Sequence, residues 1–111
     1  MVASRSPLST SIPRPDDAAI FAALGDPVRL SLLRRLVSGD GLTLAALTAT
    51  TVITRQGTAK HMATLEAAGL VVSDTVGRER RFRLAPGGLA DARRALARIE
   101  AGVPDDPAPG G

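Results

Sequence analysis

The chain has 111 residues, a length that suits one domain, since domains commonly hold about 100–200 residues. It is 44% hydrophobic but only 2% aromatic, so its core must be built from Leu, Val, Ile and Ala. It has no cysteine, which excludes disulfides, thiolate zinc sites and thiol redox chemistry and suits a reducing cytoplasm. No apolar run approaches the roughly 20 residues of a membrane-spanning helix, so we expect a cytoplasmic protein without membrane contact.

Both ends of the chain differ in composition from the middle. Residues 1–15 are rich in Ser and Pro and lack the apolar segment of a secretory signal, so we predict a flexible arm. Residues 103–111, VPDDPAPGG, predict a disordered tail. The folded domain is expected over residues 16–102.

The first two elements are predicted to be helices. Residues 16–25, DDAAIFAALG, place Ile20 and Phe21 on one face and end at a glycine. Residues 26–41 begin with Asp26, a good N-cap, followed by a proline at the first helical position, where its missing N–H costs nothing. The segment SGDG ends this second helix.

The next two helices are predicted to be short and then long. Residues 42–50 begin with a residue or two of extended chain and continue as a weak helix over residues 45–50. A turn leads to the helix at residues 54–68, for which Thr54 is the N-cap and Gly69 the stop.

Beyond this helix the apolar pattern changes from a helical to an alternating period. Residues 70–86 predict two strands joined by a tip at residues 76–79, with Phe82 and Leu84 on one side. Residues 88–102 predict a last helix. Its apolar stripe comprises Leu89, Ala92, Leu96 and Ile99.

Four helices, a hairpin and a final helix predict a mainly α fold with a small β-hairpin, the winged helix-turn-helix. In this fold the short third helix and its turn support the longer helix, which enters the major groove of DNA, and the hairpin is the wing.

The outer face of the 54–68 helix carries small, amide or basic residues. Thr58, His61, Met62 and Leu65 share the opposite side, which we expect to pack on the domain, and Glu66 is predicted to lie off the outer face. Amides read adenine, cations read guanine and small apolar groups contact thymine methyls, while wing arginines suit phosphates or the minor groove. The alternative to DNA contact by the wing is that the hairpin is only a solvated turn with charges on its free face. The predicted DNA contacts are Arg55, Gln56, Ala59, Lys60 and Ala63 on the helix and Arg78 and Arg80 on the wing at residues 76–81.

The first and last helices expose more apolar surface than one small domain needs to hide. This excess predicts a homodimer, although the last stripe could also close the core of a monomer. The predicted interface residues are Ile20, Phe21, Leu89, Leu96 and Ile99.

Three segments resemble the ArsR family of winged-helix transcriptional repressors: ALGDPVRLSLLRRL, TRQGTAKHMATLEAAGLV and GRERRFRL. The similarity covers about residues 19–98. It implies a homodimer through the first and last helices, operator binding through the fourth helix, and repression of nearby genes.

The chain departs from the family pattern in three ways. The family's Cys-x-Cys metal site is missing from LTLAALT, and the last helix has Asp91 but no histidine, so neither metal site carries over. Gly57 stands where Ala is usual, which costs helix stability but would let the backbone approach DNA closely. Ala59 replaces the usual hydroxyl residue.

We therefore expect a homodimeric repressor that binds an inverted-repeat operator in double-stranded DNA, with no cofactor, no metal and an inducer that the sequence does not identify. The alternative is a winged-helix module that binds protein or RNA without operator recognition. An enzyme is not expected, because no nucleophile–base pair, phosphate-binding glycine loop or carboxylate pair is visible. The single histidine, His61, forms no site of known geometry and is expected to be a packed or phosphate-adjacent helix residue.

Overall fold

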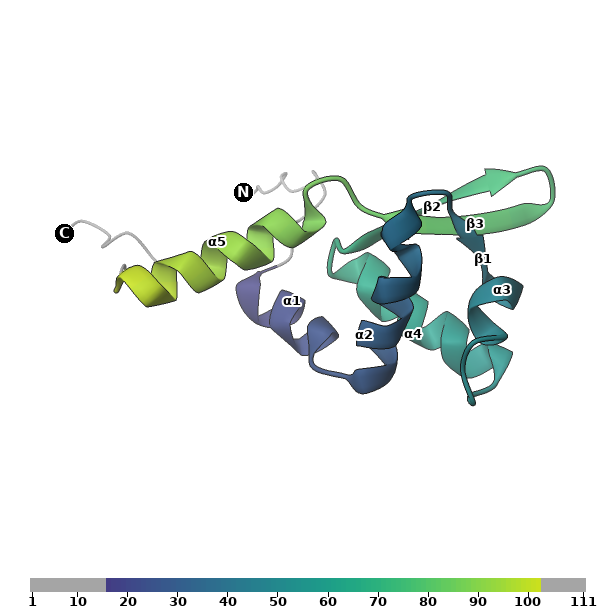
Figure 1. Cartoon of the computed structure of the whole chain (residues 1–111), viewed down its shortest axis with the longest axis horizontal. Coiled ribbons are helices and arrows are strands. Elements are labelled where there is room, and N and C mark those ends of the chain that lie inside the picture. The colour runs from purple at the N-terminus through teal and green to yellow at the C-terminus, as the bar shows by residue number, and fades with distance from the viewer. Residues whose placement is uncertain (1–15, 103–111) are drawn as a thin grey trace, which may run out of the picture.

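The computed structural model describes residues 16–102, so the arm predicted over 1–15 and the tail predicted over 103–111 lie outside the described residues. The predicted order of helices and hairpin is confirmed (Figure 1). The elements are α1 (Asp17–Leu24), α2 (Pro27–Arg35), the 3₁₀ turn η2 (Leu36–Ser38), β1 (Leu42–Thr43), α3 (Leu44–Thr48), α4 (Arg55–Ala67), β2 (Val71–Val76), β3 (Glu79–Leu84) and α5 (Gly88–Ala101).

Side-chain caps start four of the five α-helices. Asp26 accepts hydrogen bonds from the backbone N–H groups of Val28 and Arg29, and Thr54 accepts one from Gly57, so both predicted caps are confirmed. Thr43 likewise caps α3, which therefore begins one residue earlier than predicted. The α-helix of α2 ends at Arg35, before the predicted stop, because the chain tightens into η2.

The sheet has three strands in the order β1-β3-β2, all antiparallel. The hairpin was predicted, whereas the pairing of the short extended segment β1 with β3 was not. In the hairpin Ser73 lies opposite Phe82 and Val71 lies opposite Leu84. Phe82 is 3% exposed and Leu84 packs against the core, which confirms the predicted inner side of the strand.

The core lies between α1, α2, α4 and the base of the hairpin. Thr58, Met62 and Leu65 of α4 are fully buried, and His61 is half-buried, as the pattern predicted. Ile20 is only 2% exposed and belongs to this core. The prediction that Ile20 lies at a dimer interface is therefore wrong, because its side chain is already covered by the chain's own helices.

Helix α5 packs against α1 and then extends beyond the rest of the fold (Figure 1). Ala92 and Ala95 on its inner side are buried. Among residues 16–102, no helix is long and apolar enough to cross a membrane.

Candidate DNA interface

The first turns of α4 present their polar side chains to solvent. Thr54 fixes the start of the helix by capping it, and α3 packs against it. Arg55, Gln56 and Lys60 are exposed. Among residues 16–102, no ion pair involves Arg55 or Lys60, so these cations remain available to an anionic partner.

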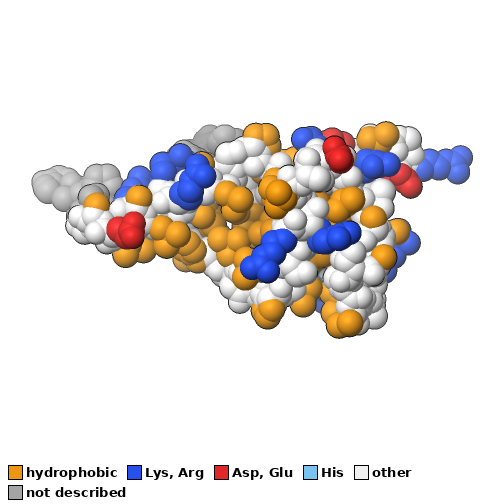
Figure 2. Space-filling model, viewed as in Figure 1, with side chains coloured by type: hydrophobic (Ala, Val, Ile, Leu, Met, Phe, Trp, Pro, Cys, Tyr) orange, Lys and Arg blue, Asp and Glu red, His pale blue; other side chains and the backbone are white. Residues whose placement is uncertain are grey.

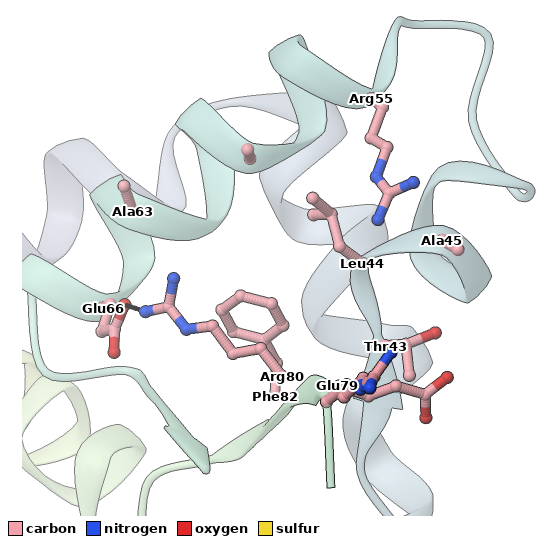
Figure 3. Close-up of a pocket in the computed structure, with 11 residues that line it drawn as sticks. Thr43, Leu44, Ala45, Arg55, Ala63, Glu66, Glu79, Arg80 and Phe82 are labelled. Carbon is pink, nitrogen blue, oxygen red and sulfur yellow. Dashed lines mark hydrogen bonds and ion pairs between the residues drawn. The ribbon is translucent and has the colours of Figure 1, made fainter. Parts of the chain in front are cut away.

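A groove of about 350 Å³ separates α4 and α3 from the wing. Five of the seven predicted DNA contacts line it, together with Glu66 and Phe82 (Figure 3). These five are Arg55, Ala59, Ala63, Arg78 and Arg80. Gln56 and Lys60 do not line the groove, but both are exposed on the same helix.

Glu66 does not lie off this face of α4, contrary to the prediction. It lines the same groove as Ala59 and Ala63, because positions four and three residues apart share one side of a helix. The face therefore contains a carboxylate, which sequence periodicity should have revealed. Its charge is opposed by Arg80, whose Nη2 lies 2.8 Å from Glu66 Oε1.

Arg80 is thus engaged within the protein, whereas Arg78 is not. Arg80 also donates to Ser73 and lies over the Phe82 ring, with 5.0 Å between Cζ and the ring centroid. Arg78 is exposed at the turn between β2 and β3 and, within residues 16–102, belongs to no ion pair.

Gly57 lies beside the turn that precedes α4. A Cβ at this position would lie 3.3 Å from Thr54 Oγ1 and 3.6 Å from Ile53 Cδ1, so this side of the helix faces the preceding turn. A close DNA contact at Gly57 stays a prediction.

His61 is a packed helix residue with one polar partner that the sequence did not reveal. Arg29 Nη1 lies 3.1 Å from His61 Nδ1. Because arginine only donates hydrogen bonds, Nδ1 is the acceptor. Arg29 also donates to the backbone oxygens of Ala22 and Ala23, which ties α2 to the end of α1 and to α4. Within residues 16–102, no group of three or more His, Cys, Asp or Glu side chains could hold a metal ion.

The other four predicted interface residues lie at the surface or near it. Leu89, Leu96 and Ile99 on α5 are 42%, 51% and 68% exposed, and Phe21 is half-buried against the core. Figure 2 shows hydrophobic side chains along one side of α5 and beside it, Lys or Arg along the other side of α5, and Lys or Arg at the far tip of the hairpin. The apolar stripe of α5 and the basic tip of the hairpin thus lie at opposite ends of the molecule.

A helix-turn-helix whose long helix and wing border one groove defines the class of winged helix-turn-helix DNA-binding regulators. The helix-turn-helix domain family matches residues 24–74. Over 68 residues the chain is 46% identical to the uncharacterized HTH-type transcriptional regulator YuzN of Bacillus subtilis (strain 168), an alignment that covers 56% of this chain and 74% of YuzN.

Two solved structures are similar in both sequence and fold. The ArsR-like transcriptional regulator from Rhodococcus sp. RHA1 is 39% identical with a TM-score of 0.68, covering 77% of this chain and 79% of that one. A structure described as a possible transcriptional regulator for arsenical resistance is 31% identical with a TM-score of 0.68, covering 73% of this chain and 83% of that one. The chain belongs to the ArsR family of winged helix-turn-helix transcriptional regulators.

Proposed function

We propose that the protein is a homodimeric repressor that binds an inverted-repeat operator. The observation that carries the proposal is the combination, in one small fold, of an exposed apolar stripe on α5 with an exposed, basic start of α4. The apolar stripe on α5 can be removed from water only by a partner surface, and the basic start of α4 suits binding to DNA.

The exposed residues at the start of α4 support base reading. Gln56 has the amide that pairs with adenine, and Arg55 and Lys60 have the donors that pair with guanine or phosphate. Ala59 and Ala63 keep the groove side of the helix small enough for a DNA strand to approach. Arg78 at the wing turn completes this set with a further cation.

The stripe on α5 supports assembly through two-fold symmetry. Leu89, Leu96 and Ile99 lie on one side of a helix that extends beyond the monomer's core, and a second copy of the same helix would cover them. A two-fold dimer repeats its recognition helices, which fit successive major grooves when they lie about 34–36 Å apart. The operator is then an inverted repeat with half-sites about ten base pairs apart, centre to centre.

The proposed regulation requires no catalysis and no cofactor. A dimer that occupies promoter DNA excludes RNA polymerase from the same sequence, which is repression by occupancy.

Selection of duplexes from a random pool, followed by sedimentation of the bound complex, tests the proposal. An enriched inverted repeat bound by two copies of the chain is the expected result. A reporter behind that sequence should be less active when the protein is present. Binding of RNA or protein without any enriched duplex would favour the alternative, a winged-helix interaction module. An enriched single half-site bound by one copy would contradict the dimer.

A further inference from the structure

Three side chains from α4, β2 and β3 form a closed ring of hydrogen bonds across the groove. Arg80 Nη2 donates to Glu66 Oε1 at 2.8 Å, and Arg80 Nε donates to Ser73 Oγ at 3.0 Å. Ser73 Oγ in turn donates to Glu66 Oε2 at 2.9 Å. Figure 3 shows the carboxylate and the guanidinium facing each other between helix and wing.

The strand register explains why these groups meet. Ser73 lies opposite Phe82, and Arg80 is two residues from Phe82, so all three share one face of the hairpin. The Arg80 guanidinium lies over the buried Phe82 ring, 5.0 Å from its centroid. It is therefore held by a carboxylate, a hydroxyl and an aromatic ring at once.

Glu66 lies at a costly place for a carboxylate. It lines a groove that also contains the cations Arg55 and Arg78, on the side of the fold proposed to meet a polyanion. An unpaired carboxylate there would repel phosphates. Pairing with Arg80 removes that repulsion, but it also occupies the guanidinium that the sequence suggested for DNA.

The pair contributes little through folding stability, because its side chains are 57% and 34% exposed, and exposed pairs add little to folding. The pair matters more for the position of the wing than for folding stability. It joins the last part of α4 to a wing strand, because Arg80 lies 14 residues after Glu66 in the chain. A wing fixed before binding loses less conformational freedom when it binds.

We propose that Glu66 and Arg80 are positioning residues: their pair fixes the wing against α4, so that Arg78 and the start of α4 engage DNA together, and Arg80 itself does not neutralise a phosphate. The inference rests on DNA binding by this groove. It assigns opposite roles to two neighbouring wing arginines, Arg78 for contact and Arg80 for positioning.

Whether Glu66→Ala raises or lowers the affinity for DNA tests the role of the pair. Removing a carboxylate near DNA should tighten binding if only charge matters. If the pair positions the wing, Glu66→Ala should instead weaken affinity for the selected duplex by about three- to tenfold, in the lower part of the range for coupled contacts. Asp74→Ala is the matched control, because Asp74 is also paired with a wing arginine, Arg83, at 3.0 Å, but without a link to α4. Tighter binding by Glu66→Ala would overturn the proposal.

The salt dependence of binding tests whether Arg80 contacts phosphate. In an Arg78→Ala background, where the contact of Arg78 is already removed, adding Glu66→Ala and Arg80→Ala should leave the log–log salt slope unchanged, because neither side chain neutralises a phosphate. Arg78→Ala should reduce the slope by about one unit. A further reduction of about one unit on adding Glu66→Ala and Arg80→Ala to Arg78→Ala would show that Arg80 contacts a phosphate and would overturn the positioning role.

A distance measurement without DNA separates this inference from the function. Since the chain has no cysteine, spin labels attach selectively to Val76→Cys on the wing and Thr64→Cys on α4, both exposed. The distance distribution should broaden when Glu66→Ala is added and stay narrow with Asp74→Ala, with circular dichroism confirming that each variant is folded. An unchanged distribution with Glu66→Ala would overturn the proposed fixing of the wing. If the wild-type protein bound no DNA duplex, that result would overturn the proposed function and leave the distance result valid.

Discussion

Gly88, the first residue of α5, lies directly against the backbone oxygen of Gly69, which lies two residues beyond the end of α4. A Cβ at Gly88 would be 2.6 Å from that oxygen and 3.2 Å from Leu70 Cα. Both neighbours are backbone atoms, so neither can rotate away. This contact sets where α5 leaves the winged domain, and therefore where the apolar stripe of α5 points.

Gly88→Ala should consequently destabilise the protein. Overpacking of this kind costs about 1–3 kcal/mol of the free energy of unfolding, to be measured by urea denaturation. The helix-favouring effect of alanine, about 1 kcal/mol at most, opposes the loss only in part. A variant as stable as the wild type would show that the backbone at Gly69 yields easily.

Gly57→Ala is the matched change in another helix, with a different expected result. Its Cβ would approach the side chains of Thr54 and Ile53 rather than backbone. The gain in helix propensity, up to about 1 kcal/mol, is opposed by crowding of the Thr54 hydroxyl that caps α4, so we expect stability to change by less than about 1 kcal/mol. DNA affinity should stay within twofold, about 0.4 kcal/mol, because this side of α4 faces the turn. A large loss of affinity at unchanged stability would place Gly57 against DNA after all.

The local structure could be predicted from the sequence because its causes are local. Asp26 and Thr54 mark helix starts by their own side chains, and the alternation around Phe82 marks a strand. The contacts that were missed join residues far apart: β1 with β3, His61 with Arg29, and Glu66 with Arg80. Periodicity gives a helix face but does not say which neighbour covers it.

Ile20 and Arg80 illustrate this limit. Ile20 and Phe21 are adjacent on α1, yet only the fold shows that Ile20 enters the core. Helical spacing could have placed Glu66 on the groove side of α4, where the prediction did not put it, but spacing could not have revealed its arginine partner. Arg80 is predicted to contact DNA, and its pairing with Glu66, a carboxylate from another element, could not be seen in the sequence.

The N-cap of α2 should make the protein sensitive to acid. Hydrogen bonds from the backbone N–H groups of Arg29 and Val28 lower the pKa of Asp26 below its ordinary value of 3.8. A carboxylate with a lowered folded-state pKa stabilises the fold above its unfolded pKa, and this contribution is lost as the pH falls through the folded value.

Asp26→Asn keeps a capping side chain but removes this titration. Urea unfolding at pH 7 and at pH values below about 4 should show a smaller loss of stability on acidification in the variant than in the wild type. Asp40→Asn, at an exposed turn carboxylate, serves as the control. Equal acid sensitivity of the Asp26→Asn and wild-type proteins would show that the cap does not depend on its charge.

Lys60 and Arg78 are proposed to contact phosphates, and each is exposed. Lys60→Ala and Arg78→Ala should weaken binding to all duplexes roughly alike and flatten the log–log salt dependence by about one unit each. Arg34→Ala, on the exposed side of α2, is the control and should leave the slope unchanged. Slopes equal to the wild type for both variants would remove these residues from the interface.

The apolar stripe of α5 offers a direct test of the proposed dimer. At 100° per residue, Leu96 lies in the middle of the stripe formed with Leu89 and Ile99, whereas Ala97 lies outside it. Leu96 is 51% exposed in the monomer, so glutamate there can reach water when the chain is alone. In a two-fold dimer it would bring two like charges together and cost several kcal/mol of association, on the order of 3.

Leu96→Glu should therefore sediment as a monomer that keeps its helical circular dichroism. It should also lose specific binding, because each half-site supplies only part of the binding free energy. Ala97→Glu makes the same change of charge one residue away and should remain dimeric and bind normally. If Leu96→Glu also remains dimeric with normal operator affinity, the stripe does not form the interface, and the two-fold arrangement of recognition helices proposed from it is wrong.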